Sequence, residues 1–301
     1  MKKNRVTIIL TGMLLPAAAL FLFSCSPEQP DYNLYENMRD YIEQRLSAHG
    51  ATARDDMPDL FTSEHVRDLT GLVRIMFGSP QLEVHLSSYE SSAVAVASYS
   101  MFEVPPDSAD YTDFAFTIRP AAGMKAPILH GDALKAMPGM PGSFELSFLD
   151  VNKEVVDSDA FLGDQVEKIN EALALVKPYQ LQEEDRGKYV QYLQDHIDER
   201  YRIEVDESYI QDATEEARKA YYDAILQAYK LYVDAYFTSL ERLTSEDTAY
   251  IETTKTNTDA FIDLVYENDV AAQLGKMLFR EDFDAYFLEG FWRDEYYGAD
   301  L

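Results

Sequence analysis

The stretch FTIRPAAGMKAPILHGDAL, residues 116–134, carries the signals that decide the fold of this chain. It begins as a strand-like alternation that ends at Pro120, passes through a loop to Pro127, and enters a second apolar run that contains Asp132. An unpaired carboxylate in such a run is costly unless it takes up a proton or finds a partner. Asp132 is therefore the first candidate functional residue, since a buried acid with a raised pKa can act as a proton donor.

Alternating apolar residues on both sides of this stretch predict an antiparallel meander of about five strands. The alternation covers residues 82–86, 94–96, 99–103, 114–118 and 144–148, and turn-rich segments lie at 87–92, 105–110, 120–123 and 137–142.

Apolar residues at helical spacing flank the meander. They predict helices over residues 35–46 and 63–76 before it, and over 162–176, 222–240, 256–266 and 271–291 after it. Because each strand and helix has an apolar side that must be buried, we expect an α/β fold, a three-layer α/β/α sandwich with a central antiparallel sheet flanked by helices on both faces. No linker rich in Gly, Ser or Pro divides residues 34–301, so they are expected to form a single domain.

Residues 1–24 predict a lipoprotein signal peptide. They combine a basic start, an apolar run over 6–23 and a small residue directly before Cys25. The junction LFSC, residues 22–25, resembles the lipobox of bacterial lipoproteins, with a bulkier phenylalanine than is usual. The alternative is an uncleaved membrane helix, which a short run broken by Pro16 disfavours. The resemblance implies an acylated Cys25 and a membrane-anchored, extracytoplasmic protein.

Residues 25–33 are then a lipidated tether that holds the domain off the bilayer. The formal net charge of −28 becomes −31 without the signal peptide, which contains three basic residues and no acidic one. Such a body repels nucleic acid, anionic lipid and acidic proteins, so nucleic acid is not an expected partner. Cys25 is the chain's one cysteine, and its acylation leaves no thiol for a disulfide, a nucleophile or a cysteine-ligated metal.

Several common catalytic signatures are absent from the sequence. It contains no glycine-rich phosphate loop, no nucleophile elbow and no His-x-x-x-His zinc pair. The five histidines are scattered, so the sequence predicts no metal centre.

The stretch 116–134 resembles the central motif of the ferredoxin-dependent bilin reductases, a superfamily that includes red chlorophyll catabolite reductase. An ungapped extension places Glu103 on the family's pocket glutamate, and residues 144–152 resemble the strand that follows in the family. The resemblance implies a linear tetrapyrrole (bilin) as substrate, reduced by coupled electron and proton transfer without a bound redox cofactor. Asp132 and Glu103 would be its proton donors.

Residues 266–297 resemble the terminal helices of the same family. There an Asn-Asp pair precedes a helical run, and its aspartate faces the pigment from the opposite side. Asn268 and Asp269 occupy that place, which implies that Asp269 is a second pocket acid. The alternative is that these acids are ordinary surface residues in a chain with 54 of them.

Two departures from the family pattern bear on mechanism. Where several members have a histidine that pairs with the acid, this chain has Ala115, and we hypothesise that His130 replaces it, because residues 130 and 132 of a strand share a face. His130 would be the proton-sharing partner of Asp132, an axial ligand to a haem-like iron, or a histidine without chemistry. The second departure is the predicted location of the protein. Ferredoxin is cytoplasmic and acidic, so it cannot reach an extracytoplasmic protein and would be repelled by an acidic one.

Three functions therefore remain open at this point. The first is an extracytoplasmic bilin-reductase-like oxidoreductase with an unknown electron donor. The second is a non-catalytic surface lipoprotein that binds haem or another tetrapyrrole in the same pocket. The third is a structural or adhesion-type lipoprotein on a repurposed fold.

Overall fold

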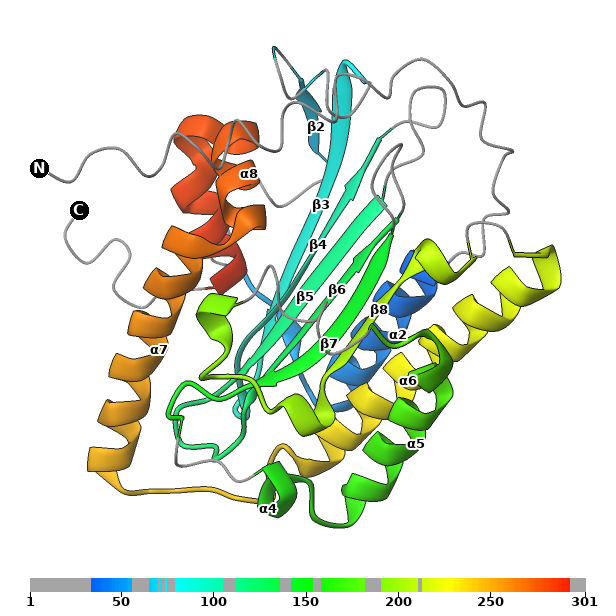
Figure 1. Cartoon of the computed structure of the whole chain (residues 1–301). Coiled ribbons are helices and arrows are strands. Elements are labelled where there is room, and N and C mark those ends of the chain that lie inside the picture. The colour runs from blue at the N-terminus through cyan, green and yellow to red at the C-terminus, as the bar shows by residue number, and fades with distance from the viewer. Residues whose placement is uncertain are drawn as a thin grey trace, which may run out of the picture.

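The chain folds into three layers around one sheet (Figure 1). The computed structural model describes residues 34–55, 65–69, 71, 74, 79–104, 112–135, 142–153, 158–181, 191–210 and 213–292. Helices α2 (Leu34–Ala48), α5 (Val166–Val176) and α6 (Glu215–Ser239) cover one face of the sheet, and α7 (Thr248–Asn268) and α8 (Val270–Phe279) cover the other. The expected three-layer α/β/α sandwich is confirmed.

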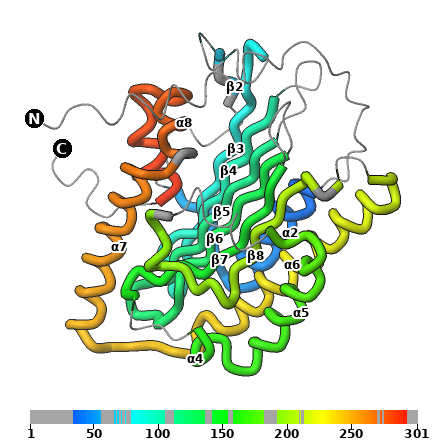
Figure 2. Tube along the Cα trace, viewed as in Figure 1, coloured from blue at the N-terminus to red at the C-terminus, as the bar shows by residue number. Residues whose placement is uncertain are grey.

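The sheet is antiparallel, and Figure 2 traces its meander. Its strands are β1 (Thr52–Ala53), β2 (His65–Asp68), β3 (Gln81–Glu90), β4 (Val94–Glu103), β5 (Thr112–Pro120), β6 (Ile128–Leu134), β7 (Ser143–Leu149) and β8 (Ile203–Asp206). Their order is β1-β3-β4-β5-β6-β7-β8, with β2 also paired to β3. The predicted alternations correspond to β3, β4, β5 and β7, and the apolar run that contains Asp132 forms β6 between β5 and β7. The segments 94–96 and 99–103, predicted as separate strands, join in β4, whose register shifts between Val94 and Val96.

Short helices connect and extend these elements. They are α4 (Ser158–Leu162), the 3-10 turns η2 (Gly163–Gln165), η3 (Lys177–Tyr179), η4 (Gln191–Leu193), η5 (Glu199–Tyr201), η6 (Glu207–Ile210) and η7 (Arg280–Asp282), and the π-helix η8 (Ala285–Trp292). None of the helices in the described part of the chain is both long and apolar enough to cross a bilayer. The signal peptide, Cys25 and the tether lie outside the described residues.

Two predicted helices differ from the structure. Within 63–76, residues 65–68 form β2 instead, because the edge of β3 offers backbone partners that pair Asp68 with Gln81. The predicted helix over 271–291 is interrupted after Phe279, where Arg280 adopts a φ of 53°. The break lets Phe283 return against Gly275, where a Cβ atom would lie only 2.5 Å from the Phe283 ring.

Tyrosines of α6 fix the layer behind the sheet through their hydroxyl groups. Tyr229 donates to the carbonyl oxygen of Met38 in α2 at 3.0 Å, and Tyr236 donates to that of Pro127 at 2.9 Å. Each ring is buried in the apolar core and each hydroxyl is satisfied, as buried tyrosines require. The bond to Pro127 anchors the loop that leads directly into β6.

Gly131 leaves room on one face of β6 for side chains of the two neighbouring strands. A Cβ atom there would lie 2.1 Å from the Phe116 ring and 2.8 Å from Leu146 Cδ2, on the face covered by α2 and α6. The strand alternates, so the neighbouring His130 and Asp132 face the other layer. The missing side chain thus allows a tight core on one side of the strand and polar groups on the other.

Replacing Gly131 with alanine should lower the free energy of unfolding by about 1–3 kcal/mol, because the added methyl group overpacks this core. Urea denaturation measures the loss. In the double variant Phe116→Leu with Gly131→Ala the loss should be smaller than the sum of the two single losses, because the shorter side chain makes room. An unchanged urea midpoint in Gly131→Ala would contradict the packing described here.

Candidate functional site

A partly open cavity of about 130 Å³ lies between the sheet and the C-terminal helices. It lies on the face of the sheet covered by α7 and α8. Its lining residues are Leu82, Ser100, Phe102, Asp113, Ala115, His130, Asp132, Glu145, Leu149, Tyr192, Leu193, Val265, Asp269, Ala272, Gly275, Leu278, Phe283, Tyr286, Phe287, Phe291 and Trp292. Most of the lining side chains are aromatic or aliphatic, and four of the lining residues carry carboxyl groups.

Asp132 is the carboxyl group whose protonation the cavity alters most clearly. Its Oδ1 atom is buried without a hydrogen-bond partner among the described residues. Burial raises the pKa of Asp132 well above its ordinary value, and the neighbouring carboxyl groups of Asp113, Glu145 and Asp269 raise it further. Asp132 therefore keeps its proton at pH values at which an exposed aspartate has lost it.

Asp113 is one of two carboxyl groups of the site, with Glu145, that were not predicted from the sequence. It lies on β5, two residues before Ala115, which pairs with Asp132 across β5 and β6. Asp113 therefore shares a face with Asp132, and both repulsion and a hydrogen bond between the two carboxyl groups contribute to the raised pKa of Asp132. The alternation Asp113, Ala115, Thr117 was available in the sequence, but the register that brings β5 beside Asp132 was not.

Glu145 is the third carboxyl group of the sheet, and it has a cation beside it. It pairs with Asp132 across β6 and β7, and its Oε1 lies 3.3 Å from Nε of Arg202. Burial raises the pKa of Glu145, and the Arg202 guanidinium opposes that rise. The Arg202 side chain is only 1% exposed and also contacts Glu204 at 2.9 Å and Glu199 at 3.1 Å, so its single charge is shared among three carboxylates.

Asp269 lies on the helical wall, as the resemblance implied, and Asn268 does not line the cavity. Asp269 caps α8 by accepting the Ala272 N–H at 2.9 Å, and it also accepts the Tyr192 hydroxyl. A side chain that caps a helix N-terminus accepts hydrogen bonds from backbone N–H groups, so Asp269 is positioned in this wall as a hydrogen-bond acceptor. Asn268 is exposed and donates to the carbonyl oxygen of Leu264.

His130 and Ala115 line the cavity beside Asp132, on the face expected from their positions. His130 Nδ1 lies 3.3 Å from Thr117 Oγ1, and burial lowers the pKa of the imidazole. The ring is accordingly neutral near neutral pH. The neighbouring side chain that most strongly raises the pKa of Asp132 is Asp113 rather than His130. The roles hypothesised for His130, as the proton-sharing partner of Asp132 or as an axial ligand to a haem-like iron, stay predictions.

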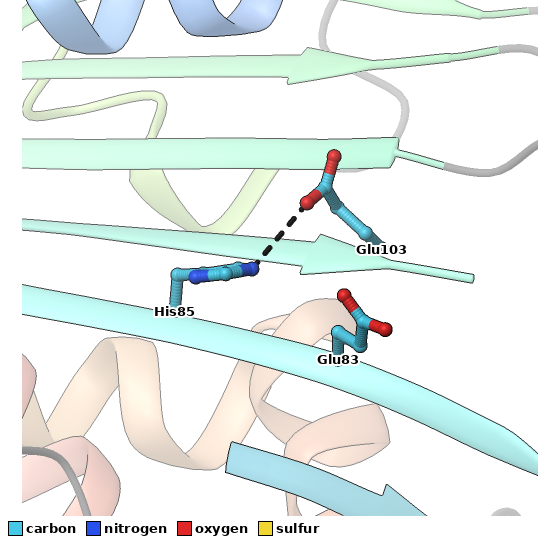
Figure 3. A group of neighbouring side chains, drawn as sticks. All are labelled: Glu83, His85 and Glu103. Atoms are coloured by element: carbon cyan, nitrogen blue, oxygen red, sulfur yellow. Dashed lines mark ion pairs between the residues drawn. The ribbon is translucent and has the colours of Figure 1, made fainter. Parts of the chain in front are cut away.

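Glu103 is not brought together with Asp132. On β4 it is paired with Thr112, and it faces the layer opposite to the cavity, because the next residue inward, Phe102, lines the cavity. Its Oε2 lies 3.4 Å from Nε2 of His85 (Figure 3). The ungapped alignment assigned Glu103 to the pocket, but the cavity-facing position of β4 is Phe102. A shift of one residue along a strand moves a side chain to the other face of the sheet.

Most of the aromatic lining comes from η8 and from Phe283 just before it. Phe279 and Tyr286 stack with ring centroids 4.2 Å apart, and Phe283 and Phe287 pack beside them. The Nε1–H of Trp292 is buried and has no acceptor among the described residues. A flat conjugated ligand would therefore meet aromatic faces and an N–H available to a carbonyl or carboxylate oxygen.

The comparisons with known proteins bear on the fold. The chain is similar to the crystal structure of phytochromobilin synthase from tomato in complex with biliverdin, with a TM-score of 0.58 and 13% sequence identity, over 85% of this chain and 83% of that chain. At this identity the likeness shows a shared fold, which confirms the fold expected from the bilin reductase resemblance. No protein-family profile and no curated protein sequence matches the chain.

The Asp132 carboxyl group should make stability depend on pH in a defined direction. Its pKa is higher in the folded chain than in the unfolded chain, where it is about 3.9. The folded state therefore binds more protons above that pH, and the contribution of Asp132 to stability is lost as pH rises. Asp132→Asn should weaken this loss, so at pH 7 the variant should be at least as stable as the parent chain.

Urea midpoints between pH 4 and pH 8 provide the measurement, and Asp263→Asn, which alters an exposed aspartate of α7, is the matched control. The control should keep the pH dependence of the parent chain. A pH dependence identical in Asp132→Asn and the parent would show that Asp132 ionises normally.

Proposed function

We propose that this protein binds a linear tetrapyrrole in the cavity and reduces it, with Asp132 as the proton donor. The observation that carries the proposal is the combination of an aromatic cavity with a buried carboxyl group whose neighbours keep it protonated. The fold shared with a phytochromobilin synthase that binds biliverdin supports the same class of ligand.

Reduction of one double bond of the pigment requires two electrons and two protons. The electrons must come from a separate donor, which the extracytoplasmic address predicted from the sequence would make an exported or membrane-bound reductant. The first proton passes from Asp132 to the pigment as negative charge develops on the ring system. Asp113 shares the hydrogen bond with Asp132 and is placed to return a proton taken up from solvent through the open side of the cavity.

The other polar groups position the ligand. The Trp292 N–H can donate to an oxygen of the pigment, and the Tyr192 hydroxyl is directed to Asp269 across the cavity from the sheet. Arg202 offsets part of the charge of Glu145. Ala115 leaves open the space beside Asp132 that a longer side chain would fill.

The test mixes the purified chain with biliverdin under anaerobic conditions and adds a photochemical reductant. Reduction should yield a new bilin with a shifted absorption band. Asp132→Asn should still bind the pigment. Its turnover should fall by about 100-fold or more, because the variant lacks the proton donor. Product analysis by chromatography measures the loss.

Glu103→Gln is the matched control, because its carboxyl group lies on the other face of the sheet. It should bind and reduce biliverdin like the parent chain, and a large loss of turnover would restore the catalytic role predicted for Glu103 from the sequence. Equal turnover in Asp132→Asn and the parent chain would contradict the proposed mechanism.

A second candidate function is capture of haem or a bilin without reduction. The formal net charge of −28 favours it, because an acidic surface disfavours an acidic electron donor of the ferredoxin type. Neutral His130 on the cavity wall could serve as an axial ligand to haem iron. In the same experiment, a spectral shift on binding with no reduced product under any donor supports capture, and the absence of any shift removes both functions.

The membrane anchor through Cys25 also belongs to this proposal. Its support is the sequence of residues 1–25 alone. Expression in a bacterial host with labelled palmitate should place the label on the parent chain in the membrane fraction. Cys25→Ala should lose both the label and the membrane association, and a membrane-bound Cys25→Ala chain would favour an uncleaved helix instead.

A further inference from the structure

Glu83, His85 and Glu103 form a cluster on the face of the sheet opposite to the cavity (Figure 3). Glu83 and His85 lie two residues apart on β3, so their side chains share a face. Glu103 of β4 is directly paired with Glu83. One nitrogen or oxygen atom from each of the three side chains lies within 4.8 Å of the others.

We infer that these three side chains form a binding site for one divalent transition-metal cation, with Zn²⁺ as the best match. Nitrogen and oxygen ligands about 2.0–2.2 Å from a Zn²⁺ ion lie about 3–4 Å from one another. The His85 Nε2 to Glu103 Oε2 distance is already 3.4 Å. Metal binding requires the three ligand atoms, now within 4.8 Å of one another, to come to the shorter separations of a Zn²⁺ site.

Charge explains why a cation fits better than an ion pair alone. Two glutamates directly opposite each other on neighbouring strands repel. A protonated His85 offsets only one of the two carboxylates, whereas a divalent cation bound to a neutral imidazole offsets both. The acidic chain as a whole, at a formal net charge of −28, also concentrates cations near its surface.

The ligand set selects the kind of metal. An imidazole nitrogen with two carboxylates suits Zn²⁺ and its transition-metal neighbours, whereas Mg²⁺ prefers an octahedron of oxygen atoms. The His85 and Glu103 side chains are 21% and 29% exposed, so the ion can enter from solvent and keep water in its remaining positions. Leu82 and Phe102, which precede Glu83 and Glu103 on their strands, line the cavity on the other face. The metal would therefore fasten β3 to β4 behind the cavity wall.

The test titrates Zn²⁺ into the purified chain by calorimetry, after chelator treatment and without a histidine tag. We expect one saturable site and a higher midpoint of thermal unfolding with Zn²⁺, which excess Mg²⁺ does not abolish. His85→Ala and Glu103→Gln should each weaken binding by about tenfold or more, since even loss of a group behind a metal ligand costs about 10–100-fold. Glu167→Gln, at an exposed acid of α5, is the matched control and should bind like the parent chain.

The absence of a saturable site would overturn the inference, and so would equal affinity in the parent chain and both site variants. Circular dichroism confirms that the variants are folded. Co²⁺ offers a readout on the parent chain alone, because a bound ion should shift the proton resonances of a single imidazole. A saturated Co²⁺ complex with no shifted imidazole signal would place the metal elsewhere. Pigment reduction in Glu103→Gln stays unchanged in either case, so this outcome is separate from that of the proposed function.

Discussion

The pleat of β6 is the constraint on which the rest of the site depends. His130 and Asp132 can face the cavity only if Gly131 faces the opposite core, where Phe116 leaves no room for a side chain. The Tyr236 hydroxyl holds the loop before β6 to α6 at Pro127. The apolar layer on one side of the strand thus fixes the positions of the polar groups on the other side.

Once placed there, the neighbouring carboxyl groups act on the protonation of Asp132. Glu145 has the shared charge of Arg202 beside it, and Asp269 accepts hydrogen bonds from the N-terminus of α8 and from the Tyr192 hydroxyl. Burial and the carboxyl groups of Asp113, Glu145 and Asp269 instead raise the pKa of Asp132. The site therefore contains one buried acid, Asp132, whose pKa is raised both by burial and by the carboxyl groups around it.

The layers and the central meander could be predicted from the sequence, because the change from a period of two to a period of 3.6 residues is a local signal. Asp132 could be predicted for the same reason, as an acid within an apolar run. Asp113 and Glu145 could not, because their proximity to Asp132 depends on the pairing of β5, β6 and β7. Glu103 shows the reverse error, since a shift of one residue in an extrapolated alignment moves a strand residue to the other face.

Asp132 is expected to keep its proton in the folded protein at pH values at which an exposed aspartate is ionised. Infrared difference spectroscopy tests this claim most directly, because a protonated carboxyl group has a carbonyl stretch that a carboxylate lacks. Such a band should be present at pH 7 in the parent chain, be lost in Asp132→Asn, and diminish while bound biliverdin is being reduced. A spectrum at pH 7 in which Asp132→Asn removes only carboxylate absorption would contradict this claim.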